Sequence, residues 1–471
     1  MKTLALLSIW TGSLLAQSGQ TVVRTFADTI LERGLDRYGP TATPLWAGVI
    51  DTGDFRVPKD GVPAPAGVRP SDRALGGCNL YHDAVSLRVF HALSEQTGDE
   101  KWSHAAREYA AAFVRLTQSP ATGLLGWGEH LYYDFFQDKV AVERRSHELI
   151  EWTPPWDLLW RENAEATAKA IAGIRYHYFE NNPQALFNRH AYWEKAEHQP
   201  AGGQPWIKHT GLYAYSFAFL YSKTREKTWR DWALGAGSLY WRNRDAATNL
   251  TEGCIGDPRP TSRHSSVGTV YLAYWLLQAW RLMPEETELR DHAVALLDAF
   301  LKHHYDGERK AYRAGMQTNG KQAGDGVLEP WHYAYGSSSS FELGRILAFF
   351  AKDLKEPRYR KAAEMVAREA AQTAIPEKVS IANVAFALNL SLDLYDLTRE
   401  KGHLTQAQAY TKVGLARFWV QSGQYGLIVR EAGDRYYESK TGAGDFAAGL
   451  LRLSLREKGK FGDVSGWDWR F

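Results

Sequence analysis

The sequence predicts an all-α fold, an (α/α) toroid or barrel in which six to seven helical hairpins surround a groove built by loops. Three observations support this class. Apolar residues recur at helical spacing over long stretches, strand signals are few, and the helical segments come in pairs joined by short polar turns. Because many successive hairpins must bury their apolar faces on one another, a closed ring is favoured over an open superhelix, whose connectors are shorter and more regular.

Five pairs of predicted helices follow one another along the chain. In the first two pairs a tryptophan, Trp102 or Trp229, stands just inside the second helix. The pairs are 80–96 with 100–117, 213–223 with 228–240, 269–282 with 287–302, 341–354 with 359–374, and 382–399 with 405–419. Each pair is typical of an antiparallel helical hairpin with a short connector.

Longer connectors lie between these hairpins and are rich in Gly, Pro, Trp and Tyr, as expected of loops that build a binding groove. They span residues 40–72, 118–149, 181–211, 245–266 and 306–337. The last stretch, 418–471, is predicted to carry a small strand pair. The Gly-Ser-Ser-Ser-Ser run at 336–340 is interpreted as the N-cap of the helix that follows it.

Composition limits the class of function. The chain has 471 residues, 44% hydrophobic and 23% charged, with a net charge of +2, which gives no basic surface for nucleic acid. Aromatic residues make up 13%, with 18 Trp. This content suits stacking on carbohydrate rings, and it equally suits a large helical core that uses Trp as filler.

The N-terminal stretch predicts export. Residues 1–16 read as a short secretory signal, with one positive charge, a short apolar segment and cleavage near Ala16. We therefore expect a periplasmic or secreted protein with one catalytic domain over residues 17–471 and no membrane span. The two cysteines, Cys78 and Cys254, form a disulfide or remain buried thiols, and both alternatives are open.

Candidate metal ligands stand in three aromatic-rich stretches, 126–134, 144–152 and 187–193. They are His130, Glu148 and His190. Imidazoles and a carboxylate suit Mn²⁺, Co²⁺, Ni²⁺ or Zn²⁺, and three protein ligands leave positions open for water or substrate. The spacing matches no short metal motif. On the residues alone, the alternative is that both histidines are hydrogen-bonded groove residues and the glutamate is a surface charge.

Taken together, the three stretches resemble the pectate lyases of polysaccharide lyase family 2. The resemblance rests on Gly-Trp-Gly-Glu-His, His-Glu-Leu and Asn-Arg-His, within residues 120–195. Enzymes of this family are (α/α) barrels that hold their metal with His, Glu and His in that order. The arginine before the last histidine is their catalytic base. The resemblance thus implies Mn²⁺, or Co²⁺ or Ni²⁺, on His130, Glu148 and His190, with Arg189 as base.

The implied chemistry is β-elimination on pectate or a related polyuronate. The C5 proton lies next to the sugar carboxylate and is removed while the C4–O bond breaks. A metal on that carboxylate, with a cationic side chain beside it, stabilises the charge that develops. A free guanidinium stays protonated at ordinary pH, although nearby cations and loss of water disfavour its charge. The alternative for Arg189 is a clamp that binds a substrate carboxylate with two parallel hydrogen bonds.

An acidic polysaccharide or oligosaccharide substrate also requires further contacts. The family places an arginine and a lysine on substrate carboxylates, and the loop cations Arg259, Arg263 and Lys208 are candidates, with solvated loop cations as the alternative. The candidate stacking platforms are Trp127, Tyr132, Tyr133, Trp152, Trp156, Trp331 and Tyr333. About half of these aromatic residues are expected in the core. His82, Asp83 and His147 are candidate partners of the ligands or alternative ligands.

Two other functions compete with a lyase. A glycoside hydrolase or epimerase on the same toroid would use two carboxylates, such as Glu129 or Asp134 with Glu148 or Asp157, and release a saturated sugar. A non-catalytic protein would use the aromatic groove to bind oligosaccharides. Absorbance of an unsaturated product separates the lyase from both.

Overall fold

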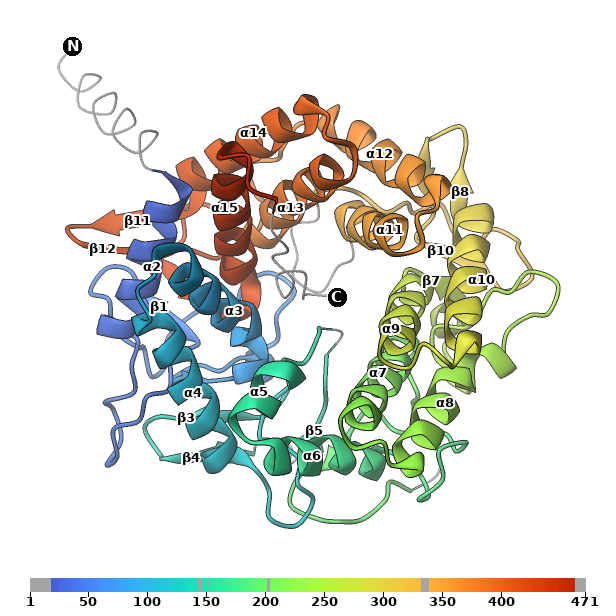
Figure 1. Cartoon of the computed structure of the whole chain (residues 1–471), viewed down its shortest axis with the longest axis horizontal. Helices are drawn as coiled ribbons and strands as arrows, with labels where there is room; N and C mark the ends of the chain where they lie inside the picture. Colours follow the sequence, from blue (N-terminus) through green and yellow to red (C-terminus); the bar gives the residue numbers. More distant parts are fainter. Residues whose placement is uncertain (1–17, 143–145, 151, 201–203, 332–338, 462–471) are drawn as a thin grey trace. The chain divides into compact units, whose positions relative to one another are not determined.

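The computed structural model (Figure 1) is mostly helical, with short strands and long connectors between the helices. It describes residues 18–142, 146–150, 152–200, 204–331 and 339–461. The predicted signal segment, 1–16, lies outside these ranges. The chain divides into two compact units: unit 1 comprises residues 1–112, 133–139 and 330–469, and unit 2 comprises 113–132, 140–329 and 470–471. The single domain over residues 17–471 stays a prediction.

Unit 2 is built on two of the predicted hairpins. Helix α7 packs against both α8 and α9, and α9 packs against α10. The helices of this unit are α5 (Trp156–Glu162), α6 (Ala164–Gly173), α7 (Ile207–Thr224), α8 (Lys227–Arg242), α9 (Gly268–Leu282) and α10 (Thr287–His304). The predicted limits of these hairpins agree with the structure to within a few residues, except that α7 begins earlier, at Ile207. The short α5–α6 pair was not predicted.

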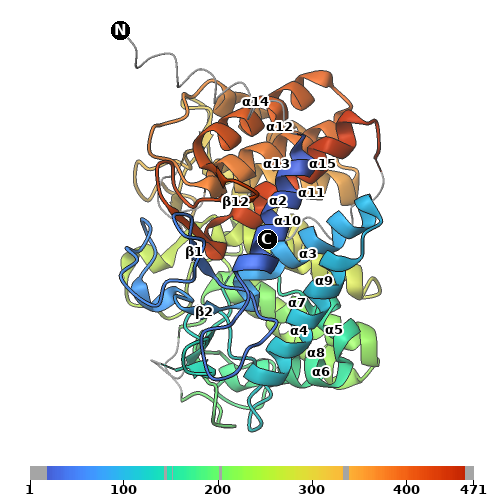
Figure 2. The ribbon, with the colours of Figure 1, turned by 90° about the vertical axis from the view of Figure 1, so that its left-hand side faces the viewer.

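Unit 1 contains the other three predicted hairpins. Its helices are α2 (Gly19–Arg33), α3 (Leu80–Thr97), α4 (Lys101–Thr117), α11 (Ser340–Leu354), α12 (Pro357–Ala371), α13 (Ile381–Thr398), α14 (Lys401–Phe418) and α15 (Ala443–Glu457). Helix α2 lies beside α15 (Figure 2). Both α2 and α15 were missed. The charged residues Arg452 and Arg456 of α15 are buried, because they pair with Asp393 and Asp396 of α13.

Local signals explain where several helices begin and end. Asn79 accepts a hydrogen bond from the backbone N–H of Tyr81 at the start of α3, and Gly98 ends that helix in the left-handed conformation. The predicted cap of α11 is confirmed at Ser339, the N-cap residue, whose backbone N–H donates to Oε2 of Glu342 over 2.7 Å. Residues 336–338 of the same run lie outside the described ranges.

The strands are short and belong to the connectors. In unit 1, β1 (Val49–Asp51) pairs with β13 (Tyr436–Glu438), and β11 (Trp419–Ser422) pairs with β12 (Tyr425–Ile428). The stretches 425–429 and 435–437, expected to form the C-terminal strand pair, do contain strands, but these strands pair with β11 and β1 and not with each other. The remaining strands are β2 (Gly77–Cys78), β3 (Tyr132–Asp134), β4 (Lys139–Ala141), β5 (Ser146–His147), β6 (Ala191–Tyr192), β7 (His264–Ser266), β8 (Tyr305–Asp306), β9 (Ala311–Tyr312) and β10 (Gly315–Gln317). Antiparallel pairs join β5 with β6, β7 with β10, and β8 with β9.

An aromatic cluster forms much of the interior of unit 2. Its rings pack mainly edge-on and tilted around α7, as aromatic pairs prefer. The members are Tyr178, Phe187, Tyr213, Phe217 and Trp232. The cluster fixes the connector before β6 against α7, and this connector carries part of the site described below. Within the described ranges, no helix is both long and apolar enough to cross a membrane.

Candidate metal centre

The β5–β6 pair brings Glu148 and His190 together. His147 of β5 is the partner of Ala191 in β6, and the two strands run antiparallel. Glu148 follows β5 directly and His190 precedes β6 directly, so continuing the register places these two residues opposite each other. Opposed residues in such a pair have neighbouring side chains on one face. Residues 42 positions apart in sequence thus become neighbours.

The loop before β3 adds His130 to the same place. Glu129 N–H donates to the carbonyl of Glu148 over 2.8 Å, which joins this loop to the end of β5. Gly128 lies in this contact with φ of +92°, and a Cβ atom there would stand 1.9 Å from the Glu148 carbonyl oxygen. Only glycine fits this position, because both the backbone angle and the close approach exclude a side chain.

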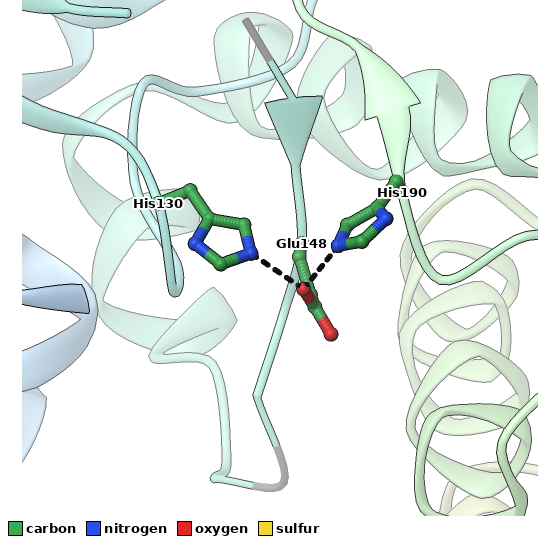
Figure 3. A group of neighbouring side chains, drawn as sticks. All are labelled: His130, Glu148 and His190. Carbon is green, nitrogen blue, oxygen red and sulfur yellow. Dashed lines mark ion pairs between the residues drawn. The ribbon is translucent and has the colours of Figure 1, made fainter. Parts of the chain in front are cut away.

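Two imidazoles meet at one oxygen of Glu148 (Figure 3). Nε2 of His130 lies 3.0 Å from Oε2 of Glu148, and Nε2 of His190 lies 2.7 Å from the same oxygen. The three ligand atoms lie within 4.8 Å of one another. Although His190 Nε2 and Glu148 Oε2 are this close, neither atom has a partner with hydrogen-bond geometry among the residues described. They converge as ligands around an ion would.

The other oxygen of Glu148 has different neighbours. Nη1 of Arg189 lies 3.3 Å from Oε1, and Nε2 of His209 lies 3.4 Å from it. His209 is in the first turn of α7. The glutamate therefore contacts an arginine and three histidines, two of them at one oxygen and one at the other.

Burial and these neighbours set the charge of Glu148. The side chain of Glu148 is 1% exposed, whereas those of His190 and Arg189 are 33% and 28% exposed. Burial by itself would raise the pKa of Glu148. The three imidazoles outweigh burial and hold this pKa well below its usual value of 4.5. The result is a buried, ionised carboxylate whose neighbours His190 and Arg189 are partly exposed to solvent.

These donors fit a divalent transition metal. Two imidazole nitrogens and one carboxylate oxygen suit Mn²⁺, Co²⁺ or Ni²⁺, and three protein ligands leave further positions open. The buried oxygen and nitrogen at the centre lack hydrogen bonds, so an ion between them would satisfy atoms that are costly to leave unsatisfied. The geometry therefore defines a possible metal site.

His147 does not join the ligands and belongs to a buried chain of hydrogen bonds behind them. Trp127 Nε1–H donates to His147 Nε2 over 3.2 Å, and His147 Nδ1 lies 2.9 Å from His177 Nε2. His177 Nδ1 in turn lies 2.9 Å from the carbonyl of Asn188. Since the indole can only donate, the order fixes a proton on Nδ1 of each neutral imidazole. Burial lowers the pKa of His147 to about 3 and that of His177 well below 6.5.

The candidate substrate cations differ in their contacts. Arg259 is exposed and pairs with Asp257 at 2.5 Å, and Arg263 is exposed nearby, with its Nε 3.4 Å from the Asp257 carbonyl. Lys208 is half-buried, with its Nζ 5.0 Å from the centre of the Tyr271 ring. All three cations belong to unit 2, as do the ligands.

Most of the predicted stacking platforms are core residues, which corrects that expectation. Trp127 is buried and packs on Trp156, and Trp152 is also buried. Trp331 is buried in unit 1 against Phe341 and Tyr410. A ring covered on its faces offers no surface to a sugar, so these tryptophans serve packing. Tyr132 is half-buried, and Tyr333 lies outside the described residues.

Other sequence candidates have structural partners elsewhere. His82 and Asp83 lie in α3 of unit 1, where Asp83 accepts a hydrogen bond of 2.5 Å from the hydroxyl of Tyr109. Cys78 and Cys254 are both buried free thiols.

Sequence reasoning missed three residues around the ligands: His177, Trp206 and His209. Trp206 precedes α7, and two guanidinium groups approach its ring, with Arg189 6.0 Å and Arg259 5.4 Å from the ring centre. His209 directly follows Lys208, and the predicted start of this helix, 213, left it in a loop. The N-cap position of α7 is Trp206, which makes no capping hydrogen bond, so the sequence carries no capping signal that would have placed His209 on the helix.

The segment that carries the ligands also carries a family match. The family model of periplasmic pectate lyases matches residues 70–254, which include all three ligands, Arg189 and His209. The resemblance to this family is confirmed. A pectate lyase family and a possible His–Glu–His metal site thus coincide in the same part of the chain.

Solved structures share the fold over nearly the whole chain. A family 76 α-mannanase from Bacteroides thetaiotaomicron matches with a TM-score of 0.52 at 10% identity, covering 95% of this chain and 99% of that one. A D-mannose isomerase matches with a TM-score of 0.52 at 9% identity, covering 93% and 97%. The unsaturated glucuronyl hydrolase of Bacillus sp. GL1 matches with a TM-score of 0.50 at 13% identity, covering 96% and 99%. At these identities the likeness shows the fold alone, and it confirms the predicted (α/α) toroid class.

Proposed function

We propose that this chain is a metal-dependent polysaccharide lyase that cleaves pectate, or a related polyuronate, by β-elimination. The observation that carries the proposal is the convergence of two imidazoles on one buried carboxylate oxygen, within the segment matched by the pectate lyase family. Carboxylate–histidine sites with open positions suit Lewis acid chemistry on an anionic sugar.

The ligands in this proposal are His130, Glu148 and His190, with Mn²⁺ as the first candidate and Co²⁺ or Ni²⁺ as substitutes. When bound there, the ion supplies positive charge that neutralises the sugar carboxylate and stabilises the charge developing beside C5. His190 is the most exposed ligand, so we expect the sugar to approach from its side.

Arg189 is the proposed base. Its guanidinium is partly exposed and stands 3.3 Å from the ligand carboxylate, next to the side from which substrate approaches. A neutral guanidine nitrogen takes the C5 proton, the C4–C5 double bond forms, and the C4–O bond breaks. The electron pair of the broken C4–O bond stays on the leaving oxygen, which takes a proton from solvent. The product carries an unsaturated uronate at its new end.

Further contacts with an acidic polymer come from loop cations. Arg259 and Arg263 are exposed, and the Arg259 guanidinium lies 5.4 Å from the centre of the Trp206 ring, which Arg189 approaches to 6.0 Å. We assign these two arginines, with Lys208, to carboxylates of neighbouring sugars. The expected export through residues 1–16 would bring the protein to a compartment where such polymers arrive from outside the cell.

A direct test measures the ultraviolet absorbance of unsaturated uronates with polygalacturonate as substrate. The protein is assayed as purified, after stripping with a chelator, and after addition of Mn²⁺, Co²⁺ or Ni²⁺. We expect a rise in absorbance that is lost with the chelator and returns with metal. Glu148→Gln is the matched control, because it keeps the side-chain shape and removes the ligand charge.

The competing functions give different results. Reducing ends without unsaturated product would identify a glycoside hydrolase, and a change of sugar configuration without cleavage would identify an epimerase. Binding of oligosaccharides without any product would identify a binding protein. Each of these results would overturn the lyase proposal.

A further inference from the structure

The two oxygens of Glu148 have separate neighbours. Oε2 receives the imidazoles of the two predicted ligands, whereas Oε1 receives Arg189 at 3.3 Å and His209 at 3.4 Å. A carboxylate that offers one oxygen to a metal needs its other oxygen held, or it rotates about its side chain. Partners of this kind orient metal ligands and are a regular part of metal sites.

His209 is buried, and its ring packs edge-on against that of Tyr213. Its side chain is 8% exposed, and within the described part of the chain neither ring nitrogen has a partner with hydrogen-bond geometry. Leaving a buried imidazole unpaired costs free energy, so its approach to Glu148 is the interaction that accounts for its place. The position on α7 is rigid, since α7 packs between α8 and α9.

The two groups on Oε1 differ in freedom. Arg189 stands in the connector before β6 with 28% of its side chain exposed, and the proposed chemistry requires it to turn toward the substrate. His209 lies on a packed helix, so its position does not change when Arg189 engages the substrate. If Arg189 alone held Oε1, its movement to the sugar would release the ligand carboxylate during each turnover.

We propose that His209 is a positioning residue that holds Oε1 of Glu148, so that Oε2 stays directed at the metal when Arg189 engages the substrate. This role rests on the metal centre of the proposed function. His209 touches neither the substrate nor the metal, and it acts through Glu148. Loss of such an outer partner typically weakens metal affinity by about 10- to 100-fold.

The test is the affinity for Mn²⁺ of the chelator-stripped full chain, measured by calorimetric titration and by the electron paramagnetic resonance of free Mn²⁺. His209→Phe keeps the ring and removes the donor, and we expect binding about 10- to 100-fold weaker than in the wild type. His209→Gln keeps an amide N–H where Nε2 stood, and we expect affinity near that of the wild type. His304→Gln is the matched control, because His304 is a buried imidazole of unit 2 that bonds Arg313 and Ser265.

A second measurement uses Arg189→Ala. Arg189 and His209 share one oxygen, but only His209 stands on a packed helix, so Arg189→Ala keeps the fixed holder and the double variant keeps neither. We expect Arg189→Ala to keep its Mn²⁺ affinity and the double variant to lose more than the sum of the two single losses. Electron spin echo modulation from ¹⁴N should show two imidazoles on Mn²⁺ in the wild type and also in His209→Gln.

The outcomes are distinct. Wild-type affinity in His209→Phe, or a third imidazole on the ion that is lost in His209→Gln, would overturn the positioning role. If His209→Phe does not fold, His209→Gln decides alone: weak binding by this variant contradicts a donor role on Oε1. A wild-type protein that binds no Mn²⁺, Co²⁺ or Ni²⁺ would remove the proposed metal centre itself, which is a separate failure.

Discussion

Glu148 in unit 2 and Asp83 in unit 1 are both buried carboxyl groups, and they respond to burial in opposite ways. The pKa of Asp83 is raised from 3.8 to about 7, because burial outweighs hydrogen bonds from neutral donors such as Tyr109 and Ser439. The pKa of Glu148 is lowered, because three imidazoles outweigh burial of a similar degree. Burial alone therefore does not identify a functional carboxyl group.

The difference also separates structural from functional polar groups. Asp83 has a short hydrogen bond to a tyrosine and serves packing between α3 and its neighbours. Around Glu148, by contrast, a carboxylate oxygen and an imidazole nitrogen that could both bind a metal lie close together without forming a hydrogen bond. The His130–Glu148–His190 cluster is therefore unfavourable without an ion and becomes favourable when an ion is bound.

The largest expected effect comes from neutralising Glu148. Glu148→Gln should abolish measurable Mn²⁺ binding, a loss beyond the roughly 10- to 100-fold that follows removal of an outer partner. Asp83→Asn makes the same chemical change at the other buried carboxyl group and should leave Mn²⁺ affinity unchanged. Calorimetric titration of the stripped proteins measures both. Equal binding by Glu148→Gln and the wild type would show that the cluster is not a metal centre.

The second effect concerns turnover at constant metal affinity. Arg189→Ala should reduce kcat on polygalacturonate by about 10²- to 10⁴-fold, the range typical of a positioned general base. Arg230→Ala is the control, since Arg230 is an arginine of similar exposure that pairs with Glu286. Full activity of Arg189→Ala would end the base assignment. A raised KM with unchanged kcat would favour the clamp.

The smallest effect is on stability and concerns Asp83. Its folded pKa, about 7, exceeds the usual 3.8, so the folded state retains a proton that the unfolded state loses. This contribution is complete below pH of about 4 and falls by at most about 1.4 kcal/mol per pH unit toward pH 7. Asp83→Asn should remove the decline, which urea unfolding at several pH values measures. An identical decline in the variant would show that Asp83 is not its source.

Sequence reasoning located the helical hairpins well because their signal is local. Apolar spacing and polar turns are properties of neighbouring residues, so the limits of α9 and α14 were close to those observed. Helix α15 was missed although it has a polar stripe, because the partners of that stripe, Asp393 and Asp396, lie on α13, about 60 residues earlier in the chain. The short β5–β6 pair is set by contacts between distant segments and has no local signature.

The ligand set was recovered through a family resemblance and not through spacing. Histidine and glutamate types at 130, 148 and 190 are visible in the sequence, whereas their meeting depends on Gly128 and the β5–β6 register. Whether a tryptophan is a platform or a core residue depends on what covers it, and Trp127 is covered by a neighbour from α5. The contact of His209 with Glu148 could not be predicted either, because Glu148 lies 61 residues earlier in the chain.

The short β5–β6 pair affects how easily the segments that carry the ligands open locally. His130, Glu148 and His190 are tied to each other by very short strands and single backbone contacts, so without a central ion these segments depend on few hydrogen bonds. An ion bound to all three residues would close two loops, 130–148 and 148–190. It would thereby lower the conformational entropy that these loops gain when the site opens. Amide exchange should then slow at 128–130, 147–149 and 189–191, and the hairpins of unit 1 should exchange as before.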